Sequence, residues 1–271
     1  MCRKIGTFND SRCIVLQRIL INRKHILMEI NTSDHSFSQV KISTVETAEG
    51  LRVFMSNVFS WMTAGLVLTG IVSYWFASDA SLFSLLHSPE GGNTILGWVV
   101  MLAPLGFVIA MGAAFQKLSY QMMMVLFIAF AVVMGMSMSY IFHIYTAGAI
   151  YKTFFVTAGT FGIMAFLGYT TKTDLTSFGK YLMMGLIGII LASVVNFFLG
   201  SSSLDYIISI IGVLVFTGLT AYDVQRIKGI GSTVENGTSL AGKAAIMGAL
   251  SLYLDFINLF LMLLRLFGGR D

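Results

Sequence analysis

Two aspartates lie inside long apolar stretches of the sequence, where an ionised side chain is costly. Asp255 sits within Ala249-Leu-Ser-Leu-Tyr-Leu-Asp-Phe-Ile-Asn-Leu-Phe, and Asp223 ends the run Phe216-Thr-Gly-Leu-Thr-Ala-Tyr-Asp. A charged side chain at the centre of a helix in hydrocarbon costs about 2.5 to 3.5 kcal/mol even on insertion scales. Such a residue is expected to face protein or water. Asp223 and Asp255 are therefore the candidate functional residues, as sites of pH sensing and of an ion pathway.

Polar residues at helical spacing strengthen the prediction that Asp255 is a functional residue. Ser251 precedes it by four positions and Asn258 follows it by three, so all three side chains share one face of a helix. The opposite face is Leu and Phe. We expect this polar stripe to point into the protein.

If the two carboxylates meet, they form a unit that holds a proton. Two negative charges in a low-dielectric site cannot both form cheaply, so the pair would titrate as one system. The protonated pair would tie its two helices together, and the ionised pair would repel itself and attract a cation. Carboxylates, with the amide carbonyl of Asn258, are hard oxygen ligands suited to calcium. The sequence predicts no cofactor and no catalytic residue.

Asp223 also has a plainer interpretation, because Arg226 follows it at i+3. The two could form an ion pair at a helix end near the lipid headgroups. At a rise of about 1.5 Å per residue, Asp223 would lie only ~5 Å inside the end of its apolar segment, and Asp255 ~15 Å inside the start of the next. A tilt, or a different length of these segments, would have to bring the two carboxylates together.

The elements that carry these residues are membrane helices. Of the 271 residues, 56% are hydrophobic and only 11% are charged, against roughly 25% charged in soluble domains. Apolar blocks of 18 or more residues, without the alternation of barrel strands, predict an all-α integral membrane protein. The seven predicted spans are 56–77, 95–115, 121–142, 153–170, 179–200, 205–225 and 245–267.

The predicted domain organisation is a polar tail, 1–55, followed by a seven-helix transmembrane domain, 56–268. The tail holds both cysteines, Cys2 and Cys13, and its first part lacks the apolar core of a secretory signal. Translation could equally begin at Met28. The formal charge of +4 does not indicate nucleic acid, because the basic residues lie in the tail or flank the spans.

The distribution of Lys and Arg predicts the orientation. Placing the N-terminus in the cytoplasm and the C-terminus outside gives eight basic residues inside against three outside. The eight are Lys41, Arg52, Lys117, Lys172, Lys180, Arg226, Lys228 and Lys243, and the three are Lys152, Arg265 and Arg270.

Small residues at short spacings predict close helix packing. They are Gly106 with Ala110, Thr217 with Ala221, and Gly185 with Gly188 and Ala192.

Residues 50–268 resemble the bacterial branch of the Bax inhibitor-1 (transmembrane Bax inhibitor motif) family. The most specific segments are Ser251-Leu-Tyr-Leu-Asp-Phe-Ile-Asn-Leu-Phe-Leu-Met-Leu-Leu-Arg-Leu-Phe-Gly268 and Ala221-Tyr-Asp-Val-Gln-Arg-Ile-Lys228. The resemblance implies a bundle whose last helix is surrounded by the other six. It also implies a calcium leak controlled by a pH-sensitive aspartate pair, which Asp223 and Asp255 match. The basic cluster that relatives can carry after the second helix is reduced here to Lys117.

The sequence also bears on three other functions. An intramembrane aspartyl protease fits Tyr222-Asp223 but needs Gly-x-Gly before its second aspartate, whereas Leu-Tyr-Leu precedes Asp255. A retinal receptor would need a lysine within the seventh span. A non-transporting regulator that binds a membrane-anchored ATP-dependent protease stays open, with residues 28–55 as the segment such a partner could grip. The expected partners are membrane lipid, calcium ions and protons, with that protease as the alternative.

Overall fold

The computed structural model describes residues 48–88 and 92–268, and within these ranges the secondary structure is helical, with no strand. Seven helices are long and apolar enough to cross a membrane, which confirms the predicted fold class and count. The predictions for Cys2, Cys13, Met28 and most of the tail concern residues outside the described ranges. The candidate spans are the first helix (Ala48–Ser78), α3 (Ile95–Ala113), Tyr120–Ile144 comprising α4 (Tyr120–Met138) and α5 (Ile141–Ile144), α6 (Ala147–Thr170), α7 (Thr176–Leu199), α8 (Ser202–Gly231) and α9 (Ser239–Phe267).

Several helices are longer than the predicted spans. The first helix already includes Ala48, before the predicted start at 56, α8 ends at Gly231 rather than 225, and α9 begins at Ser239 rather than 245. With 30 and 29 residues, α8 and α9 are about 45 Å long, against ~30 Å of hydrocarbon. Polar residues at a helix end do not stop the helix, so hydropathy located the apolar segments but not the helix termini.

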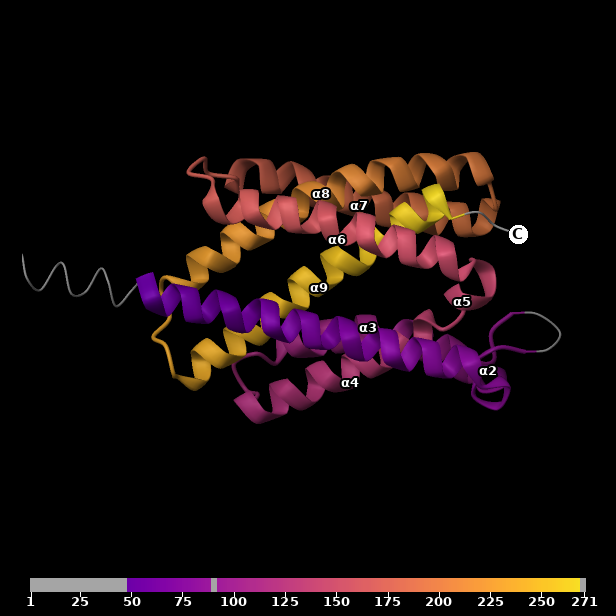
Figure 1. The fold of residues 1–271 in the computed structure, drawn as a ribbon, viewed down its shortest axis with the longest axis horizontal. Coiled ribbons are helices and arrows are strands. Elements are labelled where there is room, and N and C mark those ends of the chain that lie inside the picture. Colours follow the sequence, from indigo (N-terminus) through magenta and orange to yellow (C-terminus); the bar gives the residue numbers. More distant parts are fainter. Residues whose placement is uncertain (1–47, 89–91, 269–271) are drawn as a thin grey trace, which may run out of the picture. The chain divides into compact units, whose positions relative to one another are not determined.

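The most buried span is α9, of whose apolar window 72% is buried, against 11% for α7. It packs along α8, α6 and α4, and in Figure 1 it runs between the group α6, α7 and α8 and the group formed by the first helix, α3 and α4. The stricter expectation, that six helices surround it, stays a prediction.

A buried hydrogen-bond chain joins α9 to the first helix and α4. The hydroxyl groups of Tyr253 and Thr69 lie 2.7 Å apart, and the Thr69 hydroxyl donates to the carbonyl oxygen of Ala131 at 2.9 Å. Tyr253 is fully buried and packs edge-on against Phe127 and Phe130. In a medium without water these bonds satisfy polar groups that would otherwise be costly. They hold the segment of α9 just before Asp255 in place.

A short helix, α2 (Ala80–Leu86), follows the first span and packs on α3. Its residue Phe83 stacks on the rings of both His87 and His143, with centroids 4.3 and 3.8 Å apart. Burial lowers the pKa of His87, and the charge of nearby His143 lowers it further.

This lowered pKa predicts that α2 loosens in acid. When α2 is released, His87 takes up a proton near its ordinary pKa of 6.5, whereas the packed state resists protonation to lower pH. The packing should therefore be fully stable above about pH 6.5 and weaken as pH falls below it. We expect hydrogen exchange of the α2 amides, corrected for the intrinsic pH effect, to be several-fold faster at pH 5 than at pH 7. His87→Gln should remove that difference, and its persistence in this variant would assign it to another group.

Candidate functional site

Asp255 lies deep in the most buried helix. It is 16 residues from the first residue of α9, or ~24 Å along the axis, and only 5% of its surface is exposed. One carboxylate oxygen, Oδ2, is buried without a hydrogen-bond partner. Because buried polar groups are nearly always paired, this oxygen marks a place where a proton, water or cation is expected.

The predicted supporting residues stand on the same face of α9 as Asp255. Ser251 and Asn258 are half-buried, one turn to either side of it. Neither hydroxyl nor amide reaches the Oδ2 atom of Asp255. They flank Asp255 on this face of α9 without binding its Oδ2 atom.

Asp223 lies on α8, eight residues before its end. Its Oδ1 atom is 3.5 Å from Nη1 of Arg226, and the two side chains are 13% and 52% exposed. The ion pair suggested by the i+3 spacing is thus present, and Arg226 reaches from it toward the surface. Asp223 is therefore the more exposed of the two aspartates.

The relative height of the two aspartates follows from the packing of α8 on α9. A Cβ atom placed on Gly248 would lie 3.1 Å from Ile227, and one placed on Gly212 would lie 2.8 Å from Met262. In these two contacts the residue number rises along α9 as it falls along α8, so the helices are antiparallel. Counting residues from the contacts places Asp223 of α8 at about the same height along the helix axes as Ser251 of α9. Asp255 therefore lies about one turn deeper, ~6 Å along the axis. This offset is smaller than the ~10 Å mismatch expected from the apolar segments, because the ends of the two helices are not level. Ile227 lies four residues before the end of α8, whereas Gly248, which it contacts, lies nine residues after the start of α9.

The two carboxylates form an electrostatic group rather than a hydrogen-bonded pair. Asp223 and Arg226 are the charged groups that act on Asp255, but the contacts of the described residues include no hydrogen bond between the two carboxylates, and the ion-pair partner of Asp223 is Arg226. The expected latch contact is therefore not formed in this structure. A difference of one turn is within the reach of a shared water molecule or cation.

As ligands, the two carboxylates supply only part of a calcium site. Calcium takes six to eight oxygens at about 2.3 to 2.6 Å, and no cluster of three or more His, Cys, Asp or Glu side chains occurs within residues 48–88 and 92–268. Asp223, Asp255 and Asn258 are therefore candidate oxygen ligands, and most positions around such an ion would fall to water.

Polar clamps that the sequence did not predict position α8 and α9. The Nζ atom of Lys228 donates to the carbonyl oxygen of Tyr169 at 2.7 Å, and that of Lys243 donates to the carbonyl oxygens of Phe115 and Leu118 at 3.0 and 3.1 Å. Cations near helix C-termini satisfy carbonyl groups that have no partner in the helix. In the sequence these lysines indicated only topology, because their partners lie 59 or more positions away.

At the opposite end of the bundle, Arg265 contacts Asp205, with Nη1 3.4 Å from Oδ1. This contact gives a structural reason for a basic residue on the side where the charge rule expects few. The orientation itself stays a prediction.

The chain is similar to bacterial membrane proteins over most of its length. The family described as "Inhibitor of apoptosis-promoting Bax1" matches residues 51–271. Inner membrane protein YbhL of Escherichia coli K12 is 48% identical over 229 residues, covering 84% of this chain and 96% of that protein. A protein of Borreliella burgdorferi is 43% identical over 80% of this chain and 92% of its own length, and protein RP147 of Rickettsia prowazekii is 43% identical over 82% and 92%. With the seven helices and these matches in agreement, the chain belongs to the Bax inhibitor-1 family of multi-pass membrane proteins.

Proposed function

We propose that this protein is a pH-regulated calcium leak of the bacterial inner membrane, in which Asp223 and Asp255 control ion passage. The observation that carries the proposal is the buried, unpartnered Oδ2 atom of Asp255, one turn deeper than a second carboxylate. The location draws support from the name of the Escherichia coli relative, inner membrane protein YbhL. The assignment includes no catalytic role.

The charges of the site suggest how it would work. Two carboxylates and the guanidinium of Arg226 are electrically neutral together when the site holds one proton. As pH rises and that proton leaves, the site gains a negative charge in a low-dielectric setting and attracts a cation. The same charge repels the two carboxylates from each other and would loosen α8 against α9. The leak is therefore expected to rise with pH.

Calcium entry into proteoliposomes tests this proposal. Vesicles that contain the purified chain and an entrapped calcium indicator should take up calcium faster at pH 8 than at pH 6, with an ionophore giving the total capacity. Asp174→Asn is a matched control, since Asp174 is an exposed loop carboxylate bonded to Thr176. It should behave as wild type. Uptake equal to that of protein-free vesicles at every pH would contradict a leak.

The alternative is a regulator that binds a membrane-anchored ATP-dependent protease. Deleting residues 28–47, which leaves the first helix intact from Ala48 onward, and measuring substrate turnover by such a protease, beside calcium uptake, separates the two functions. A leak should survive changes in the tail that abolish a regulatory effect. Loss of regulation with no calcium uptake in any variant would favour the regulator.

A further inference from the structure

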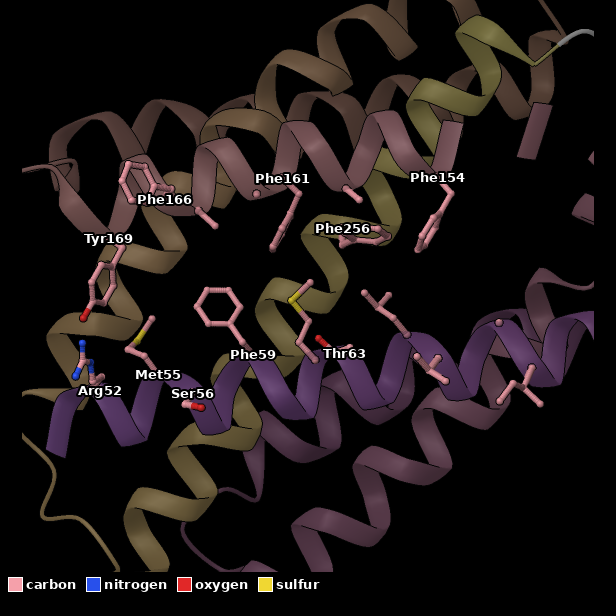
Figure 2. Close-up of a pocket in the computed structure, with 18 residues that line it drawn as sticks. Arg52, Met55, Ser56, Phe59, Thr63, Phe154, Phe161, Phe166, Tyr169 and Phe256 are labelled. Carbon is pink, nitrogen blue, oxygen red and sulfur yellow. The ribbon is translucent and has the colours of Figure 1, made fainter. Parts of the chain in front are cut away.

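A long apolar groove runs between the first helix and α6. Its volume is about 980 Å³, at the upper end of ordinary ligand sites. One wall is formed by the first helix from Arg52 to Ile71 and the other by α6 from Phe154 to Tyr169, and Phe256 of α9 forms part of the floor (Figure 2). The wall of α6 alone extends for ~22 Å.

Two glycines keep this groove open. A Cβ atom placed on Gly70, in one wall, or on Gly162, in the other, would have no atom within 4 Å. Side chains at these positions would point into unfilled space. The groove is thus formed by small residues as well as by the spacing of the helices.

The polar groups of the groove gather at one end. Arg52 and Ser56 lie there on the first helix, and Figure 2 shows the Tyr169 hydroxyl directed toward the Arg52 side chain. Lys228 adds a second positive charge, since its Nζ atom lies 4.8 Å from the centre of the Tyr169 ring. No carboxylate within the described parts of the chain forms an ion pair with Arg52. This end of the groove is therefore positively charged and able to form hydrogen bonds, whereas the rest of the groove is apolar.

The chemistry of this arrangement matches one class of occupant. A guanidinium beside a hydroxyl binds phosphate well, and basic pockets between membrane helices hold anionic headgroups. In the apolar remainder of the groove, Thr63 is the main polar side chain. Such a lining suits an acyl chain. It does not suit an extended peptide, because the backbone N–H groups of the peptide would find no hydrogen-bond partners there. The length of the groove exceeds the ~15 Å of one leaflet, so a full chain can lie along it.

We propose that the groove between the first helix and α6 binds one molecule of an anionic phospholipid, with its phosphate at Arg52 and Tyr169 and an acyl chain along the groove. Such an occupant would touch Phe256, whose ring packs against Phe154 and Phe161 at centroid distances of 5.7 and 5.5 Å. Phe256 is the neighbour of Asp255, so the lipid would lie beside the candidate site. Any effect on calcium passage rests on the proposed function, whereas binding itself does not.

Native mass spectrometry of the full chain tests the proposal without a flux assay. The protein is equilibrated in detergent with equal amounts of phosphatidylglycerol and phosphatidylcholine that carry acyl chains of equal length and distinguishable mass. The wild type should retain one phosphatidylglycerol at several-fold the level of phosphatidylcholine. Arg52→Gln should lower that ratio to about one, while Lys180→Gln, which removes an exposed charge outside the groove, should leave it unchanged.

Filling the groove tests the position of the acyl chain. Gly162→Leu should reduce the retained phosphatidylglycerol about tenfold. Gly159→Leu is the matched control, because Gly159 also faces open space on α6 but does not line the groove. Gly70→Leu fills the groove from the opposite wall. It serves as the test variant if the thermal melt of Gly162→Leu in detergent shows that Gly162→Leu does not fold.

Three results would overturn the proposal. Equal retention of the two lipids by the wild type would mean unspecific surrounding lipid only. Equal retention by folded Gly162→Leu and Gly159→Leu would place the bound lipid elsewhere. A protein that stays bound in the groove after purification, in place of lipid, would identify a partner helix as the occupant.

Discussion

Replacing Asp255 with asparagine is expected to remove the pH dependence of calcium uptake. Asparagine keeps the shape and hydrogen-bonding capacity of the side chain but cannot ionise. The wild-type leak should change by up to about tenfold per pH unit on the steep part of its profile, because a one-proton transition changes the population ratio by that factor. The Asp255→Asn profile between pH 6 and pH 8 should be flat. Fluorescent calcium uptake in proteoliposomes measures both.

Asp174→Asn serves as the control for the exchange of a carboxylate for an amide at an exposed position. A thermal melt in detergent confirms that the Asp255 variant is folded. A folded Asp255→Asn protein with the wild-type pH profile would leave Asp255 with a structural role and would favour the regulator.

Gly168→Leu is expected to destabilise the bundle by about 3 kcal/mol or more. A Cβ atom on Gly168 would lie 2.3 Å from the carbonyl oxygen of Ala221 and 2.9 Å from its Cα atom. These are backbone atoms of α8 and cannot move aside as a side chain can, so α6 and α8 would have to separate. Overpacking of a well-packed site usually costs about 1 to 3 kcal/mol, and a contact with backbone belongs at the upper end. Thermal unfolding in detergent measures the loss.

The matched control for this change is Gly159→Leu on the same helix, where the added side chain meets open space. It should melt within a few degrees of the wild type. Equal melting of the two variants would show that α6 and α8 do not approach closely at Gly168. Because Ala221 lies two residues before Asp223, the same variant should also disturb the candidate site.

The number of spans could be predicted because hydrocarbon requires long apolar helices, and nothing else in the chain produces blocks of that length. The ends of α8 and α9 could not be predicted from the sequence. Residues 226–231 and 239–244 are polar enough to leave the hydropathy window, yet they stay helical. The Thr238 hydroxyl caps the start of α9 by accepting the N–H of Ala241.

Close packing was predicted only in part. Gly185 approaches Val215, but Cβ atoms on Gly106 and Gly188 would meet no atom within 4 Å. The tightest backbone contact between two spans joins Gly168 of α6 to Ala221 of α8. Ala221 belongs to a predicted pair, whereas no short motif indicated Gly168. Small residues are used both at helix contacts and beside lipid or grooves, and their spacing alone does not separate these uses.

The candidate aspartates stood out because a carboxylate in an apolar helix is rare and costly. The ion pair with Arg226 could be read from the i+3 spacing. The one-turn offset between Asp223 and Asp255 could not, because it depends on the register of α8 against α9, which contacts such as Gly248 with Ile227 set. The groove beside α6 left no signal in the sequence, since its walls lie about 100 positions apart.

The central claim is that Asp223 and Asp255 act as one unit, and a double-mutant cycle on the pH profile of calcium uptake tests it most directly. Wild type, Asp223→Asn, Asp255→Asn and the double variant are compared in proteoliposomes between pH 6 and pH 8. If one shared proton controls passage, each single change should remove the pH response, and the double variant should add nothing further. Independent contributions that sum in the double variant, or a wild-type profile for Asp223→Asn, would contradict the account.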